Sequence, residues 1–262
     1  MESAFAKLGR AREHLSTLEN ETEAFHARDT HTFDQEVTDY PLDPAIKVIT
    51  RRVHINEAPP QSWSLLLGDI LTNLRAALDH AVYGHAVARQ SLTFEQEKQI
   101  SFPVVLERER WPRARRNLAP LVAPAVLNSI ELSQPFNHRI DPKMAPLTSF
   151  NTLVNEDKHR ALRVVSYRHG PVHVDTAAEI VGVEDQPREW TDGAVVARAL
   201  VRVPAGMPCL PGHLPVRFKF VIGEGPTVYV PGVDLHWPIV STMGSCVDMV
   251  ERILANLKGA GC

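Results

Sequence analysis

The sequence Ser64–Val87, SLLLGDILTNLRAALDHAVYGHAV, decides the fold that we predict for this chain. Apolar side chains recur along it at steps of three and four residues: Leu67, Ile70, Leu71, Leu74, Leu78 and Ala81. This spacing is that of one face of an α-helix, so we expect a long helix with a buried apolar side. On the opposite side of the expected helix, Asp69, Asn73, Ala76 and His80 form a mostly polar line of side chains. A candidate functional site is therefore expected on this helix.

Two charged residues of the same stretch lie on the flank between these two lines. Arg75 and Asp79 are four residues apart, and such a pair stabilises a helix by about 0.2–0.5 kcal/mol. A purely structural role is one interpretation of this pair. A buried hydrogen-bonded network is likewise one interpretation of Asp69, Asn73 and His80. The other interpretation is that these polar side chains form a catalytic or ligand-binding site.

A second helix is predicted over residues 147–167, LTSFNTLVNEDKHRALRVVSY. Asn151, Asn155 and His159 form a polar line on it, and Lys158 lies within its apolar side. Lys158 can extend its ammonium group from an apolar flank into solvent, which would make this segment an ordinary helix surface. Alternatively, Asn155, Lys158 and His159 face the polar line of the first helix and bind a ligand together with it.

Further segments complete the expected order of elements. Helices are predicted over residues 3–28, 94–99, 120–132 and 241–257, and a strand is predicted over residues 46–55. Residues 29–44 are rich in turn-forming side chains. Four β-branched runs between Gly, Pro and Asp residues predict an antiparallel meander: 172–183, 194–203, 216–222 and 227–233.

This order of segments predicts an α+β protein. Residues 1–168 are expected to form a helical bundle domain that carries the candidate site. Residues 169–262 are expected to form a small antiparallel β-meander followed by a C-terminal helix, packed as one unit with the bundle.

Composition narrows the classes of function. The 262 residues carry a formal net charge of −3, so contact with nucleic acid would need a local basic patch such as residues 107–116, ERERWPRARR. No apolar run reaches the roughly 18–20 residues that span a bilayer, and Cys209, Cys246 and Cys262 lack metal-ligand spacing. These features predict a cytoplasmic protein without a membrane segment. No P-loop, dinucleotide-binding or serine-hydrolase motif is present, so no cofactor is expected.

The motif GDILTNLRAALDHAVY at residues 68–83 is followed by an FPV turn at 102–104, a QPF turn at 134–136 and NEDKHRAL at 155–162. Together these resemble a widespread, functionally uncharacterised bacterial family with GDILxNLRxALDH, FP, QP and NxDKHR motifs. Thr72 stands where that family often has a histidine. The resemblance covers roughly residues 5–168 and implies that two polar helix faces meet in a helical bundle. It implies no particular reaction.

The spacing R-x4-H from Arg75 to His80 resembles that of HEPN-type domains, which are helical bundles and often metal-independent ribonucleases. The resemblance implies a homodimer in which Arg75 clamps a phosphate and His80 is the acid and base, with Asp79 and Asn73 as orienting neighbours. A guanidinium fits phosphate oxygens with two parallel hydrogen bonds, and histidine titrates near neutral pH. Residues five apart on a helix point about 140° away from each other, so a partner subunit must complete such a site. The leading hypothesis is a ribonuclease of toxin or phage-defence type that acts on RNA.

Two other functions are left open. A non-enzymatic binding or interaction protein would use the polar helix faces as architecture and bind its partner elsewhere. A metal-dependent enzyme would bring Asp69, His80 and His159 together, since two imidazoles and a carboxylate can bind a metal ion. Two sequence pairs also have the Glu-x-x-His spacing of di-iron helical bundles, namely Glu23–His26 and Glu156–His159.

Overall fold

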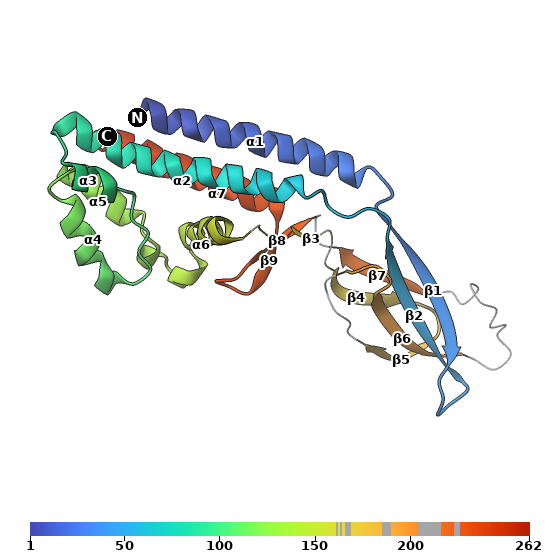
Figure 1. The fold of residues 1–262 in the computed structure, drawn as a ribbon. Coiled ribbons are helices and arrows are strands. Elements are labelled where there is room, and N and C mark those ends of the chain that lie inside the picture. The colour runs from blue at the N-terminus through green and yellow to red at the C-terminus, as the bar shows by residue number, and fades with distance from the viewer. Residues whose placement is uncertain (161, 163, 166–168, 185–189, 204–215, 223–225) are drawn as a thin grey trace. The chain divides into compact units, whose positions relative to one another are not determined.

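The computed structural model describes all residues except 161, 163, 166–168, 185–189, 204–215 and 223–225 (Figure 1). The chain forms two compact units, and each unit is built from segments that are separate in sequence. The helical unit comprises residues 1–21, 61–164 and 228–262, whereas the β unit comprises residues 22–60 and 165–227.

Helices and strands alternate in blocks along the chain. The α-helices in the described residues are α1 (Glu2–His26), α2 (Ser62–Arg89), α3 (Phe94–Gln99), α4 (Trp111–Leu118), α5 (Pro124–Leu132), α6 (Pro146–His159) and α7 (Ile239–Gly259). Short 3₁₀ helices are η1 (Arg108–Arg110), η2 (Pro135–Asn137) and η3 (Pro142–Met144). The strands are β1 (His31–Asp39), β2 (Ile46–Ile55), β3 (Val164–Val165), β4 (His169–Asp175), β5 (Glu179–Glu184), β6 (Val195–Arg202), β7 (Arg217–Ile222), β8 (Thr227–Val230) and β9 (Leu235–Pro238). The α+β layout predicted from the sequence is confirmed.

Helices α1, α2 and α7 are the long elements of the helical unit (Figure 1). Helix α1 runs antiparallel to α2, because hydrogen bonds join Ser3 to His80 and Glu21 to Trp63. It is also antiparallel to α7, since Lys258 lies over the ring of Phe5 and Arg12 forms an ion pair with Glu251. The apolar side of α2 is buried in the core of this unit, as the sequence predicts: Leu67, Ile70, Leu71, Leu74, Leu78 and Ala81. Burial of this face is the main source of stability for such a helix.

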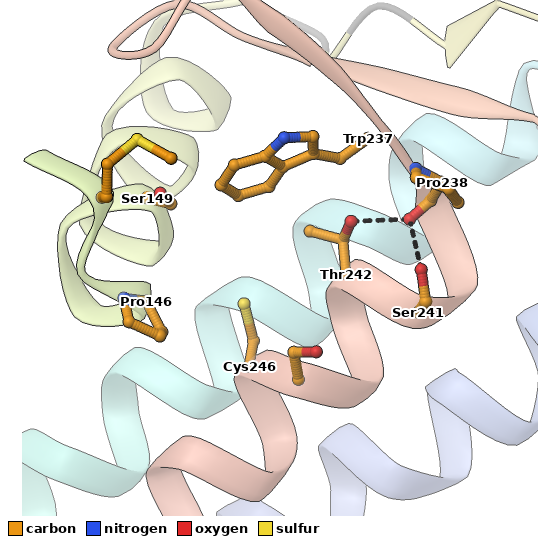
Figure 2. A pocket seen from close by; sticks show the side chains of 9 residues that line it. Pro146, Ser149, Trp237, Pro238, Ser241, Thr242 and Cys246 are labelled. Carbon is orange, nitrogen blue, oxygen red and sulfur yellow. Dashed lines mark hydrogen bonds between the residues drawn. The ribbon is translucent and has the colours of Figure 1, made fainter. Parts of the chain in front are cut away.

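Helix α6 packs on both α2 and α7, and α5 packs on α7. The chain enters α7 directly from β9, where Pro238 precedes the first helical residue. The hydroxyl of Thr242 donates a hydrogen bond to the Pro238 carbonyl oxygen at 2.6 Å, and that of Ser241 donates to the same oxygen at 3.4 Å (Figure 2). In the described residues, β9 belongs to a small sheet of order β3-β8-β9.

The β unit contains two layers in its described residues. Four strands form an antiparallel sheet of order β1-β2-β6-β5, and β4 pairs with β7 in a second ladder. Alternate side chains of β6 point toward one face and are fully buried there, as the period-two geometry of a strand requires. The core between the layers consists of Ile49, Ala197, Ala199, Val201, Val203, Val216 and Phe218.

The structure differs from the sequence predictions in three places. Residues 29–44, expected to be turns, contain β1, which pairs with β2 along its whole length from His31–Ile55 to Asp39–Lys47. Its side chains alternate only between exposed and half-buried, so β1 lacks a strong apolar pattern. The helix expected over 147–167 ends at His159, where Arg160 adopts extended backbone angles. The strands after residue 168 do not form a simple meander, because β6 lies between β2 and β5.

The division of the chain also differs from the single boundary expected after residue 168. Helix α7 belongs to the helical unit, where it packs against α2. The hairpin of β1 and β2 belongs to the β unit, because β2 supplies one of the two neighbours of β6. Long-range strand pairing and helix packing of this kind leave no local mark in the sequence.

Candidate functional site

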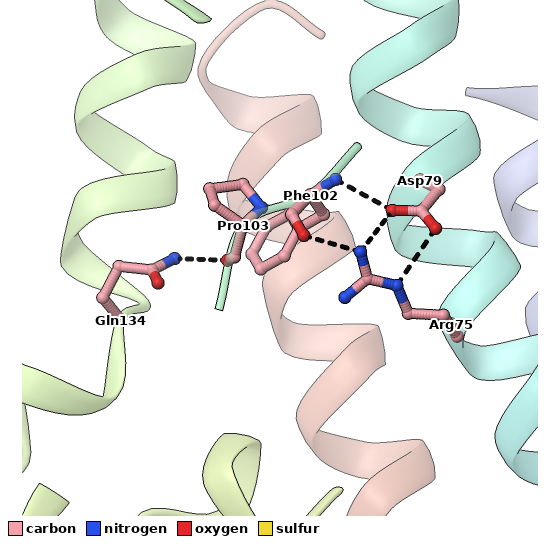
Figure 3. A network of polar contacts seen from close by, with 5 residues as sticks. All are labelled: Arg75, Asp79, Phe102, Pro103 and Gln134. Atoms are coloured by element: carbon pink, nitrogen blue, oxygen red, sulfur yellow. Dashed lines mark hydrogen bonds and ion pairs between the residues drawn. The ribbon is translucent and has the colours of Figure 1, made fainter. Parts of the chain in front are cut away.

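Arg75 and Asp79 together hold the backbone of Phe102 (Figure 3). The guanidinium makes two hydrogen bonds to the carboxylate, Nε to Oδ2 at 3.0 Å and Nη2 to Oδ1 at 2.9 Å. Nη2 also donates to the Phe102 carbonyl oxygen at 2.8 Å, while the Phe102 amide donates to Asp79 Oδ1 at 2.8 Å. The two side chains are 18% and 30% exposed, so this is a partly buried, charge-assisted network. This network attaches the FPV turn to α2.

Gln134 holds the same turn from the other side (Figure 3). Its amide oxygen accepts from the Val105 amide at 2.9 Å, and its amide nitrogen donates to the carbonyl oxygens of Pro103 and Ile130, each at 3.0 Å. Only 2% of Gln134 is exposed, and a buried carboxamide must satisfy both its donors and its acceptor. The QP turn thus fixes the FPV turn through side-chain hydrogen bonds to its backbone.

The FPV turn, α2 and α6 enclose a polar pocket of about 430 Å³. We call it the motif pocket, because the motifs of α2, the FPV turn and α6 all contribute to its wall. Its lining residues are Arg75, Asp79, Ser101, Phe102, Pro103, Val104, Asn151, Val154, Asn155 and Lys158. Asn155 and Lys158 of α6 line this pocket together with Arg75 and Asp79 of α2, and not with the line of Asp69, Asn73 and His80 that they were expected to face.

The motif pocket carries a surplus of positive charge and of hydrogen-bond donors. Arg75 and Asp79 neutralise each other, whereas the Lys158 ammonium has neither a hydrogen bond nor an ion pair with any described residue. The carboxamides of Asn151 and Asn155 also make no side-chain hydrogen bond within the described part of the chain. Lys158 and Asn155 are exposed, and Asn151 is half-buried. These groups can therefore reach a ligand that enters from solvent.

Asn73 and His80 lie elsewhere, at the contact between α2 and α1. The His80 Nδ1 atom and the Ser3 hydroxyl form a hydrogen bond of 2.8 Å. The Lys7 ammonium donates to the Asn73 side-chain oxygen at 3.4 Å, and the Asn73 amide donates to the Asp69 carbonyl oxygen at 2.8 Å. These bonds join the two helices, and within one chain His80 lies apart from Arg75, as their five-residue spacing predicts. The cause is the helical period, which directs them to different sides of α2.

Asp69 and His159 are both exposed and do not line the motif pocket. In the described part of the chain, no three His, Cys, Asp or Glu residues lie close enough to hold a metal ion. The metal site expected from Asp69, His80 and His159 is therefore wrong, and neither Glu-x-x-His pair belongs to such a cluster. Helical spacing placed Asp69 and His80 on one line of α2 and His159 on a line of α6, but it does not determine whether the two lines face each other.

Asp157, the residue before Lys158, has a pKa raised by burial and, secondarily, by the nearby charge of Asp69. It packs against the backbone of α2 at Gly68, where an added Cβ atom would lie only 2.6 Å from its Oδ1 atom. Gly68 thus permits the close approach of α6 to α2. This approach brings Lys158 and Asn155 toward Arg75.

Sequence reasoning did not assign a functional role to Gln134 or Asn151. The signal for Gln134 was its place in the QP turn, which the family resemblance includes. The signal for Asn151 was its position four residues before Asn155, which puts both carboxamides on one side of α6. Neither signal indicates which other element these residues contact.

We compared the chain with protein-family models, with curated proteins and with solved structures, and none of the three comparisons gives a match. None of the helices in the described part of the chain combines the length and apolar character that crossing a membrane demands.

Proposed function

We propose that this chain is a binding protein for a small phosphate-bearing molecule and that the motif pocket is its site. The observation that carries the proposal is the unpaired Lys158 ammonium beside the already neutralised pair of Arg75 and Asp79. A pocket with one unbalanced positive charge favours an anion. Lysine binds phosphate as a compact point charge on a flexible stem.

The remaining donors of the pocket complete the set that a phosphate group needs. The Nη1 atom of Arg75 makes no hydrogen bond to a described residue, because Nε and Nη2 supply all the bonds of its guanidinium. The carboxamides of Asn151 and Asn155 can each donate from their amino group. Asp79 and Gln134 support this arrangement by fixing the guanidinium and the FPV turn. Because Asp79 and Gln134 already hold these groups in place, binding of a ligand costs little conformational entropy in this part of the pocket.

The proposal is tested by titrating inorganic phosphate into the wild type and Lys158→Met, with calorimetric detection at constant ionic strength. Lys143→Met is the matched control, because Lys143 is exposed and lies outside the motif pocket. We expect the affinity for phosphate to fall at least about tenfold in Lys158→Met, which corresponds to about 1.4 kcal/mol. The control should bind like the wild type. Absence of phosphate binding by the wild type, or an equal loss in both variants, would refute the proposal.

The hypothesis that the chain cleaves RNA remains a second proposal, supported by the HEPN-like spacing of Arg75 and His80. It requires a homodimer, because within one chain His80 bonds to Ser3 while Arg75 lines the motif pocket. Incubation with mixed RNA and EDTA, together with measurement of the molar mass in solution, tests it. Cleavage by a dimer that persists in EDTA and is lost in a folded His80→Ala variant would support it. A monomer without cleavage would exclude it.

We also propose that the protein is located in the cytoplasm. Cys246 and Cys262 are both free thiols in the structure, as is usual for proteins of a reducing compartment. Cys209 lies outside the described residues.

A further inference from the structure

A second pocket, of about 300 Å³, lies between α6, β9 and α7 (Figure 2). We call it the Trp237 pocket. Its lining residues are Met144, Pro146, Ser149, Trp237, Pro238, Ser241, Thr242, Ser245 and Cys246. It shares no residue with the motif pocket, so a ligand bound here is independent of the function proposed above.

The wall of the Trp237 pocket is mostly apolar and carries no charged side chain among its described lining residues. Trp237 is half-buried and presents its indole ring to the pocket, with Pro146 on the far side (Figure 2). Met144 adds a thioether, which makes favourable contacts with aromatic rings and adapts readily in shape. An indole, a proline ring and a thioether together favour a flat aromatic molecule over a branched or charged one.

Among the described residues that line this pocket, Ser149 carries the buried polar group that has no partner. It is 4% exposed, and its hydroxyl oxygen is buried without a hydrogen bond. A serine inside a helix commonly donates to the carbonyl oxygen four residues earlier, but the Ser149 hydroxyl makes no such bond to Ala145. By contrast, the hydroxyls of Ser241 and Thr242 donate to the Pro238 carbonyl oxygen. Figure 2 shows Ser149 on α6 facing Trp237 across the pocket.

Cys246 keeps the floor of the pocket uncharged. Its side chain is buried in α7, and burial raises the pKa of its thiol to about 12. The thiol therefore stays protonated at neutral pH, and it acts as a small apolar surface rather than as a nucleophile. An anionic ligand would find no compensating charge in this wall.

We propose that the Trp237 pocket binds a neutral, planar aromatic molecule whose ring packs on Trp237 and whose single polar group hydrogen-bonds to Ser149. The unpartnered hydroxyl explains why a polar substituent on the ring strengthens binding, since burial of a polar group is costly unless it is paired. The pocket lies at the lower end of the volume range of small-molecule sites, which restricts the ligand to about one substituted ring.

Three probes that differ in one group test this proposal: 4-methylphenol, toluene and 4-methylbenzoate. Their binding to the whole chain is followed by calorimetry and by the change in tryptophan fluorescence. We expect the wild type to bind 4-methylphenol about tenfold more tightly than toluene, because only the phenol can pair with Ser149. The benzoate should bind most weakly, because its charge would have to be desolvated in an uncharged wall.

Ser149→Ala should remove the preference for 4-methylphenol while leaving the affinity for toluene unchanged. Ser241→Ala is the matched control, because it removes a hydroxyl from the same pocket that is already paired with Pro238. The control should keep the full preference. Ser245→Phe, which places a ring in the pocket from an exposed position of α7, should abolish binding of both neutral probes.

Three results would overturn the proposal. The first is the absence of binding of 4-methylphenol to the wild type. The second is a preference for the phenol that survives Ser149→Ala, and the third is binding of the benzoate as tight as that of the phenol. Circular dichroism of each variant distinguishes a lost ligand contact from a lost fold.

Discussion

The two polar sides of α2 contain similar side chains but differ in what those side chains bind. On one side, Arg75 and Asp79 bind each other and the backbone of Phe102, and they line the motif pocket. On the other side, His80 and Asn73 each make a single bond to α1. The first side fixes the FPV turn and lines the motif pocket, whereas the second side joins two helices.

This difference shows that the number of hydrogen bonds a polar side chain makes, rather than its residue type, decides how much it contributes to stability. Each polar atom of the Arg75–Asp79 pair that faces the FPV turn has a partner, so loss of either residue leaves other polar groups unpaired. The bond between His80 and Ser3 is peripheral and exposed, so water can replace either partner. Substitutions on the two sides should therefore have very different effects.

Asp79→Ala should have the largest effect on stability. It leaves the Arg75 guanidinium without its carboxylate and the Phe102 amide without its acceptor, which we expect to cost about 2 kcal/mol of unfolding free energy after allowance for partial exposure. Chemical denaturation followed by circular dichroism measures this change. Asp69→Ala is the control, because it removes an exposed carboxylate from the same helix. Equal destabilisation by the two variants would contradict the importance of the network.

His80→Ala should have a much smaller effect, about 0.5 kcal/mol, because it removes one exposed hydrogen bond. Ser3→Ala removes the other partner of the same bond and should give the same value. The double variant should cost no more than either single variant, since there is only one bond to lose. Destabilisation of His80→Ala as large as that of Asp79→Ala would erase the distinction between the two sides.

Asp157→Asn should have the smallest effect, and its sign is opposite. The raised pKa of Asp157 means that the folded state disfavours the ionised carboxylate, through burial and the charge of Asp69. The neutral carboxamide of the variant would avoid this cost, so the midpoint temperature at pH 7 should rise, by less than about 2 °C. The native Asp157 is protonated more readily in the folded state than in the unfolded state, so the wild type regains stability as the pH falls. The difference between the two proteins should therefore shrink in melts recorded at lower pH.

The local elements of the fold could be predicted because each has a periodic apolar pattern. The strand Ile46–Ile55 has the bounds expected for it, and α1, α2 and α7 lie where their apolar faces indicated. Strand β1 escaped prediction because one of its faces is exposed and the other is only half-buried. The position of β6 between β2 and β5 pairs β2 with a strand from a distant part of the sequence, and no local pattern records such a pairing.

The candidate site could be predicted only in part, for a related reason. The helical period correctly separates Arg75 from His80, but it cannot say which neighbour each residue meets. The motif pocket exists because Gln134 and Asp79 fix the FPV turn between two helices, and these contacts are tertiary. The Trp237 pocket could not be predicted from the sequence, since nothing in the sequence distinguishes a serine without a hydrogen-bond partner from any other small residue of a helix.

The discontinuous helical unit has a consequence for how the protein is made. The segments that supply α1 and α2 are synthesised before residues 165–227, and α7 follows only after them. About 170 residues separate the end of α2 from the end of α7, so at translation rates of about 5–20 residues per second the apolar side of α2 waits about 10–30 s for its partner helix. During that time Leu67 and its neighbours are available to chaperones or to other nascent chains. The slow step in producing this protein is therefore expected to be the arrival of α7, and codon usage between these segments would set the length of the wait.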